Sequence, residues 1–187
     1  MVPTVPVLAD TRSVRYNFTS SFGQKLRKSA KRGYTGKKTV SYSTREVPGT
    51  IVINTRQRAL YLVLKNGKAI RYGVGVGRQG FSWKGAAHIR RKAKWPSWHP
   101  PEEMRQRELK QNGRELPKMM PGGPNNPLGA RALYLFQGNK DTLYRIHGTN
   151  NPGSIGFAQS SGCIRLLNSE IVDLYRRVRI GAKVVVA

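Results

Sequence analysis

Residues 50–76 read TIVINTRQRALYLVLKNGKAIRYGVGV and contain three short runs rich in β-branched, aromatic and aliphatic side chains. The runs cover residues 50–54, 59–64 and 68–76. Asn66 and Gly67 separate the second run from the third, and this pair favours a type I′ hairpin turn because both residues tolerate a positive φ. Three strands this close in the chain predict an antiparallel meander.

The remaining strand and helix signals lie toward the C-terminus. Further strand-like runs cover residues 131–136, 142–147 and 183–186. One helix is predicted over residues 168–179, because apolar residues recur there at helical spacing and Asn168 is a favourable N-cap. Residues 81–130 are expected to form long loops with a short helical piece at 102–110, since prolines cluster at both ends of this region.

The charge of the chain is far from average. The 187 residues carry 34 Lys and Arg against 9 Asp and Glu, a formal net charge of +25. Residues 1–46 contribute ten basic and two acidic residues and show no sustained periodicity, so we interpret them as a basic, mostly irregular arm ahead of a domain at 47–187. Charge alone predicts an anionic partner, either nucleic acid, an acidic lipid surface or an anionic cell-envelope polymer.

The single cysteine, Cys163, excludes an internal disulfide framework and a cysteine-cluster metal site. No apolar run approaches the length of a membrane span, and residues 1–8 lack the features of a signal peptide.

The densest cluster of reactive residue types follows the strand at 142–147. His147 ends this strand, and Cys163 follows sixteen residues later, after a loop rich in Gly, Ser and Asn. Such a loop can fold back and form a nucleophilic pair in which the imidazole deprotonates the thiol. Gly162 would expose backbone N–H groups for an oxyanion, and Arg165 would favour the thiolate or bind a carboxylate. The spacing also allows a simpler interpretation, with Cys163 as a small buried residue and His147 as a structural histidine.

Three other features of the sequence have simpler explanations than a second site. His88 and His99 lack the short spacing of zinc ligands, so no metal is expected. The run 90–95 (RRKAKW) is consistent with nucleic-acid binding but is better explained as a solvated basic loop. Gly75 lies in a Gly-x-Gly-x-Gly segment that continues a strand, so it predicts a close backbone approach rather than a phosphate site.

The cluster resembles the signature of the L,D-transpeptidase catalytic domain (the YkuD-type family). That signature is His-Gly, a spacer of about fifteen residues, then Ser/Thr-His-Gly-Cys, an apolar residue and Arg or Asn; here it reads HGTN at 147–150 and SSGCIRL at 160–166. The stretches 95–101 (WPSWHPP) and 121–129 (PGGPNNPLG) also resemble the family, and the likeness covers residues 47–187 but not the arm.

The resemblance implies a mainly β fold: a sandwich-like mixed β-sheet with one principal C-terminal helix and long lid-like loops. It implies Cys163 as nucleophile and His147 as general base, with the Gly148 carbonyl orienting the imidazole and no cofactor. Substrate contacts are expected from Arg165, Arg131, Thr149, Asn150 and Ser160, and orientation of the reacting groups from Gly162 and Ser161. The family has a second His where this chain has Ser161, which cannot carry a charge near neutral pH, so the base role falls on His147 alone. Phe81–Gly85 replaces the usual Thr-Pro-x-Gly segment.

The function implied is a peptidoglycan L,D-transpeptidase acting on stem peptides of the meso-diaminopimelate type. The acyl acceptor stays open: a second stem peptide, an envelope protein amine, or water as in an L,D-carboxypeptidase. A basic nucleic-acid-binding module with no specific nucleic-acid motif and a non-catalytic wall-binding domain are the alternatives from other classes. The substrate implies the periplasm as location, with the signal peptide removed from this chain, and the oligomeric state is not predicted.

Overall fold

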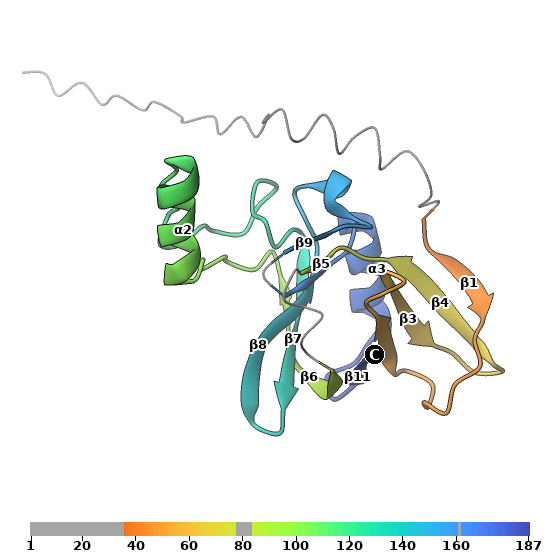
Figure 1. Ribbon diagram of the computed structural model, residues 1–187. Helices are drawn as coiled ribbons and strands as arrows, with labels where there is room; N and C mark the ends of the chain where they lie inside the picture. Colours follow the sequence, from red (N-terminus) through yellow and green to blue (C-terminus); the bar gives the residue numbers. More distant parts are fainter. Residues whose placement is uncertain (1–35, 78–83, 161) are drawn as a thin grey trace, which may run out of the picture.

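The computed structural model describes residues 36–77, 84–160 and 162–187 (Figure 1). The strands are β1 (Lys38–Ser41), β2 (Ile51–Asn54), β3 (Ala59–Val63), β4 (Lys68–Gly73), β5 (Val76–Gly77), β6 (Gly85–Lys94), β7 (Arg131–Gln137), β8 (Lys140–His147), β9 (Ala158–Ser160), β10 (Ile164–Arg165) and β11 (Lys183–Val186). The helices are α2 (Glu102–Asn112) and α3 (Asn168–Arg177), with a 3₁₀ turn η2 (Pro152–Ser154). The predicted class, mainly β with a mixed sheet and a C-terminal helix, is confirmed. Neither helix of the described segments is long and apolar enough to cross a bilayer.

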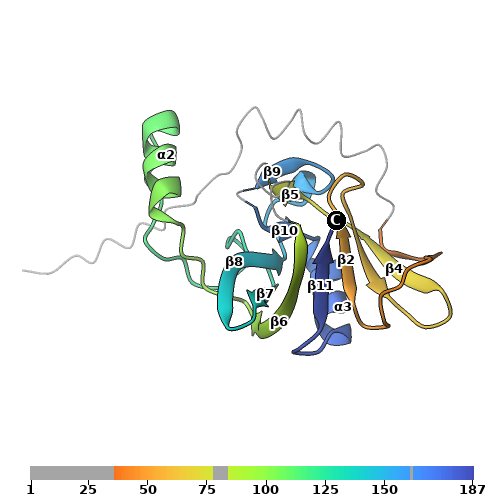
Figure 2. The same ribbon diagram turned by 60° about the horizontal axis from the view of Figure 1, so that its bottom comes forward.

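Within the described residues, nine strands form one sheet in the order β1-β4-β3-β2-β11-β6-β7-β8-β10, and β5 pairs with β9. The pairs β2–β11 and β8–β10 of this sheet are parallel, and its other neighbours are antiparallel. Figures 1 and 2 show α3 lying against the sheet, while α2 stands apart from it. The C-terminal strand β11 therefore joins the meander to the β6–β7–β8 part of the sheet.

The meander is present as predicted. β2, β3 and β4 pair antiparallel in sequence order, and Asn66 and Gly67 both have positive φ values, 58° and 63°. Strand alternation sends Ile51 and Ile53 into the main core and Val52 into a smaller cluster on the other face, with Tyr61. Burial on both faces explains why these runs are almost continuously apolar.

Helix α3 covers the main core, as its apolar stripe predicts. Ile171 and Leu174 are fully buried in the cluster that also contains Leu133 and Leu135 of β7. The helix ends at Arg177, two residues before the predicted end. Asn168 is its first residue and does not cap it; Leu167 occupies the N-cap position without a side-chain hydrogen bond.

Replacement of Leu174 by alanine is expected to lower the free energy of unfolding by about 2–5 kcal/mol, because it removes buried methyl groups and leaves a cavity beneath the helix. Urea denaturation of the purified protein measures this change. Arg176→Ala, on the exposed side of α3, is the matched control and is expected to change stability by less than about 0.5 kcal/mol. Equal effects of the two replacements would contradict the packing of α3 on the sheet.

The prediction of loops over residues 81–130 is wrong for residues 85–94, which form the ten-residue strand β6 between β11 and β7. The apolar alternation is short, with Ala87 and Ile89 buried, and the basic run 90–94 hides the remaining strand signal. Part of this run is used within the fold rather than solvated. The Arg91 guanidinium lies 4.5 Å from the Tyr134 ring centroid, and Lys92 Nζ donates to two carbonyl groups at the end of α3.

The sheet begins earlier than the predicted domain boundary at residue 47. β1 pairs with β4 through backbone hydrogen bonds, so residues 38–41 of the segment assigned to the arm are an edge strand. Two ion pairs fix this segment to the domain: Lys37 with Asp173 at 2.6 Å and Glu46 with Lys183 at 2.9 Å.

Loops 95–101 and 113–130 surround the short helix α2, and Asn126 joins them. Its side chain is 1% exposed and donates to the carbonyl oxygens of Pro96, Met120 and Pro121 at 3.0, 3.2 and 2.9 Å. Its Oδ1 accepts from the backbone N–H of Leu128 at 2.8 Å. One buried amide thus holds together two proline-rich segments that lack a regular backbone ladder.

Candidate active site

His147 ends β8, and Cys163 directly precedes β10, which pairs with β8 in parallel. Ile146 lies opposite Ile164, and both belong to the main core. His147 lies opposite Arg165. Because side chains alternate between the two faces of a sheet, His147, Arg165 and Cys163 share the face away from the core. The topology therefore brings together the three residues that the sequence motif predicts.

The imidazole of His147 is buried, and its Nδ1 lies 2.6 Å from the carbonyl oxygen of Gly148. A carbonyl oxygen can only accept, so the neutral ring carries its proton on Nδ1, and Nε2 is the unprotonated nitrogen. Burial lowers the pKa of His147 to about 4, while the hydrogen bond to Gly148 opposes this decrease and the charge of Arg165 adds to it. The imidazole is therefore uncharged at neutral pH, the form required of a general base.

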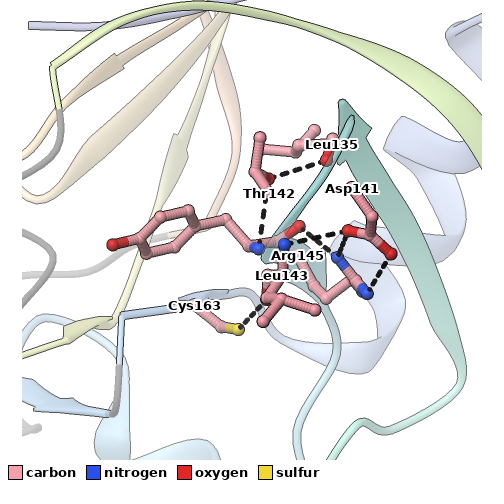
Figure 3. Close-up of polar contacts among 7 residues, drawn as sticks. Leu135, Asp141, Thr142, Leu143, Arg145 and Cys163 are labelled. Carbon is pink, nitrogen blue, oxygen red and sulfur yellow. Dashed lines mark hydrogen bonds and ion pairs between the residues drawn. The ribbon is translucent and has the colours of Figure 1, made fainter. Parts of the chain in front are cut away.

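Cys163 is half-buried, and its Sγ donates to the carbonyl oxygen of Leu143 at 3.9 Å (Figure 3). Burial raises the pKa of the thiol, while the backbone N–H and charge of Arg145 and the charge of Arg165 oppose this increase. The resting pair is accordingly a neutral thiol and a neutral imidazole. The thiol proton must leave during attack on a substrate, rather than before it.

A bulge in β8 faces the thiol. Leu143 has a φ of 60°, a left-handed conformation that is uncommon for a residue other than glycine, and its side chain is 76% exposed. The Asp141 carboxylate accepts from the Leu143 N–H at 2.8 Å and from both terminal nitrogens of Arg145 at 2.7 and 2.8 Å (Figure 3). Asp141 thereby holds both the bulge and the guanidinium whose charge opposes the increase in the pKa of Cys163.

Arg165 has a buried guanidinium with unused donors. Its Nε and Nη2 have no hydrogen-bond partner in the part of the chain that the structure describes. Its backbone pairs with Gly75 in both directions, at 2.8 and 2.9 Å, and a Cβ at Gly75 would lie 3.3 Å from Nε and 2.7 Å from the Ser154 carbonyl oxygen. This close approach agrees with the prediction for Gly75. Because a buried cation is costly without an anionic partner, Arg165 is suited to binding a carboxylate.

Gly162 directly precedes the thiol and has a φ of 116°. A Cβ there would lie 2.7 Å from the Tyr144 ring, so glycine is required on both counts. Ser160 ends β9, where its backbone pairs with Gly77. Ser161, the expected orienting residue, lies outside the described residues.

The other residues predicted to bind substrate make contacts within the fold. Thr149 is buried, and its Oγ1 bonds to the backbone of Asn151, so it closes the loop after β8. Asn150 is exposed and donates to the Asn125 carbonyl oxygen at 2.7 Å. The Arg131 guanidinium lies 5.5 Å from the ring centroid of Tyr175 on α3, across the sheet from His147.

The sequence did not point to a role near the candidate site for four residues: Asp141, Leu143, Arg145 and Asn168. The first three residues had a weak sequence signal for a bulge. Asp141 and Arg145 carry opposite charges four residues apart, a spacing that places both on one face of a strand, and the apolar alternation fails between them. Asn168 had none, since its partners are backbone groups 38 and 19 residues away. Among residues 36–77, 84–160 and 162–187, no group of three His, Cys, Asp or Glu side chains is arranged to hold a metal ion.

Comparison with known proteins gives a consistent family. The model of the L,D-transpeptidase catalytic domain, YkuD, matches residues 48–186. Probable L,D-transpeptidase YbiS of Escherichia coli K12 is 37% identical over 139 residues, which are 72% of this chain and 43% of YbiS. The chain thus spans less than half the length of this relative.

Two solved structures share the fold. A crystal structure from Brucella melitensis, described as a probable carnitine operon oxidoreductase, is 46% identical with a TM-score of 0.56, and covers 84% of this chain and 98% of that one. An L,D-transpeptidase from Mycobacterium smegmatis is 17% identical with a TM-score of 0.54, covering 80% of this chain and 67% of that chain.

Proposed function

Because the chain belongs to the L,D-transpeptidase catalytic domain family, we propose that it is a peptidoglycan L,D-transpeptidase acting through a cysteine thioester. The observation that carries this proposal is the neutral imidazole of His147 on the same sheet face as the sole thiol, with its Nδ1 held by a carbonyl group. This arrangement serves acyl transfer, and nothing in it is specific to an oxidoreductase reaction of the kind named for the Brucella melitensis chain.

In the first step, Nε2 of His147 takes the proton of Cys163 as Sγ attacks the carbonyl carbon at the L-centre of meso-diaminopimelate in a tetrapeptide stem. The tetrahedral intermediate collapses when the C–N bond to the terminal D-alanine breaks, and the imidazolium returns its proton to the leaving amine. The product is a thioester on Cys163. An acceptor amine then attacks the thioester, His147 takes the proton that the amine loses, and the imidazolium passes this proton to the leaving sulfur, which restores the thiol and the neutral imidazole.

Two groups assist in charge stabilisation. We assign the oxyanion to backbone N–H groups at Gly162 and Cys163, because Gly162 has no side chain to cover that peptide group. We assign a substrate carboxylate to Arg165, whose buried Nε and Nη2 lack partners among the described residues.

The acceptor decides which member of the reaction class the protein is. A stem-peptide amine gives a cross-link, an envelope-protein amine gives a protein tethered to the wall, and water gives an L,D-carboxypeptidase. We favour the cross-link. The net charge of +25 suits a polyanionic envelope, and we propose the periplasm as the working location.

Intact-protein mass spectrometry tests the proposal. Incubation with a disaccharide-tetrapeptide followed by acid quenching is expected to give an adduct equal to the donor minus D-alanine, located on the peptide that contains Cys163, together with free D-alanine. Because the chain has one cysteine, protein alkylated at the thiol is a complete negative control. An unmodified mass with no D-alanine release would refute the assignment, and the mass of the soluble product identifies the acceptor.

A further inference from the structure

Asn168 contacts two backbone segments that are distant in the chain. Its Oδ1 accepts from the N–H of Ala130 at 2.9 Å and from the N–H of Thr149 at 3.2 Å. The first donor directly precedes β7, and the second lies two residues after His147. The side chain therefore does not cap α3, although it belongs to the first residue of that helix.

The second of these hydrogen bonds reaches the base through a single peptide group. The N–H of Thr149 and the carbonyl of Gly148 belong to the same planar unit, and in a trans peptide they point in opposite directions. The carbonyl end lies 2.6 Å from Nδ1 of His147, and the N–H end donates to Asn168. Fixing one end of a rigid plane fixes the direction of the other end.

The surrounding backbone leaves space for this amide and for little else. A Cβ on Gly129 or on Gly148 would overlap the Asn168 Oδ1. A Cβ on Gly129 would also overlap the Gly148–Thr149 peptide group, and Gly129 has a φ of 64°. Two glycines therefore allow the loop at 129, the loop at 148 and the start of α3 to meet around one oxygen atom.

We propose that Asn168 is the positioning residue of the general base: it holds the Gly148–Thr149 peptide plane so that the Gly148 carbonyl keeps His147 in the Nδ1–H tautomer. The chain of contacts runs from the imidazole through one peptide group to a side-chain amide, in the place where many cysteine and serine acyltransferases use a side chain bonded directly to the histidine. The expected change in kcat rests on the proposed function, whereas the expected effect on the His147 tautomer does not.

Two substitutions separate the effect of the Asn168 hydrogen-bond acceptor oxygen from the effect of the rest of its side chain. Asn168→Ala removes the acceptor and is expected to lower kcat for D-alanine release by about 10–100-fold, with less than about a twofold change in KM, since a small misplacement of a catalytic group costs rate rather than affinity. Asn168→Asp keeps an acceptor oxygen at the same position and is expected to retain kcat within about threefold of the wild type. Ser169→Ala, at the exposed next position of α3, is the control for the helix.

A spectroscopic readout distinguishes positioning from general stabilisation. The chain has three histidines, so ¹⁵N-histidine labelling of the full protein gives few ring signals. The wild type and Asn168→Asp are expected to show one histidine held as the Nδ1–H tautomer, and Asn168→Ala is expected to show that signal averaged between tautomers. Thermal melting of each variant shows whether the protein is folded.

A folded Asn168→Ala protein with wild-type kcat and an unchanged histidine signal would overturn the inference. A folded Asn168→Asp protein that loses kcat and the tautomer as fully as Asn168→Ala does would also overturn it, because the acceptor oxygen would then be irrelevant. The tautomer experiment needs no substrate. It therefore tests Asn168 even if the wild type releases no D-alanine, which is the outcome that would count against the proposed function instead.

Discussion

Replacement of Cys163 by alanine is expected to abolish D-alanine release from a disaccharide-tetrapeptide, a loss of at least about 10³-fold, because the covalent route disappears with the nucleophile. Cys163 is the sole cysteine, so no second thiol can substitute. The fold should be unaffected, since the side chain is half-buried at the edge of the sheet and lies outside the main core. Release of D-alanine measured by a coupled assay, with thermal melting in parallel, checks both statements.

Cys163→Ser and Arg176→Ala complete this experiment. The serine variant is expected to be as inactive as the alanine variant, because the lowered pKa of His147 makes it too weak a base for an alcohol. Arg176→Ala, exposed on α3, should retain wild-type activity. Undiminished release by Cys163→Ala would exclude the thioester mechanism. Salt-dependent nucleic-acid binding that survives the replacement would favour the basic binding module instead.

Replacement of His147 by glutamine is expected to lower kcat/KM for D-alanine release by about 10²–10⁴-fold, the contribution typical of a positioned general base. Glutamine is similar in length and can donate to the Gly148 carbonyl, but it cannot accept the thiol proton at neutral pH. Steady-state kinetics with the disaccharide-tetrapeptide measures the loss. A thermal melt shows whether the buried position tolerates the amide.

The pH profile provides the control for His147. Because protonation removes the base, activity falls as the pH decreases through the pKa of His147, and the value of about 4 places the acidic limb of kcat/KM near pH 4. An exposed histidine would place it near about 6.5. The limb is expected to vanish in His147→Gln. A limb that persists unchanged in this variant would mean that another group acts as the base.

Part of the large positive charge is used within the fold and at the candidate active site. Two of the basic residues act near the thiol, because the charges of Arg145 and Arg165 both oppose the increase in the pKa of Cys163. Arg165 also has two guanidinium nitrogens without a hydrogen-bond partner within the described segments. Other basic side chains make contacts that stabilise the fold. Lys92, for example, donates to two carbonyl groups at the end of α3. Only the remainder is available to attract a polyanionic envelope, so net charge overstates the case for a nucleic-acid partner.

The parts of the fold that could be predicted are those that depend on residues close together in the chain. Alternation over residues 50–76, the Asn66-Gly67 turn and the apolar stripe of α3 depend on neighbours a few residues away, and each is present. The catalytic pair of His147 and Cys163 stays a prediction, but the strand ends that carry these two residues are neighbours in the sheet. The loop between them closes β8 onto β10, and both strand ends carry the motif.

Other features depend on distant backbone groups. β6 is not predictable from its own residues, because its partners β7 and β11 bury Ala87 and Ile89 from far along the chain. Asn168 has the residue type of an N-cap, but its acceptor oxygen bonds to the backbone of Ala130 and Thr149 instead of its own helix. By itself, the sequence determined which residues could react and predicted the strands whose apolar alternation is local, such as those at residues 50–76. The tertiary structure alone decided which backbone N–H groups lay within reach of the Asn168 side-chain oxygen. The physical reason is that a side-chain hydrogen bond goes to whatever unpaired backbone group the packed elements bring within reach.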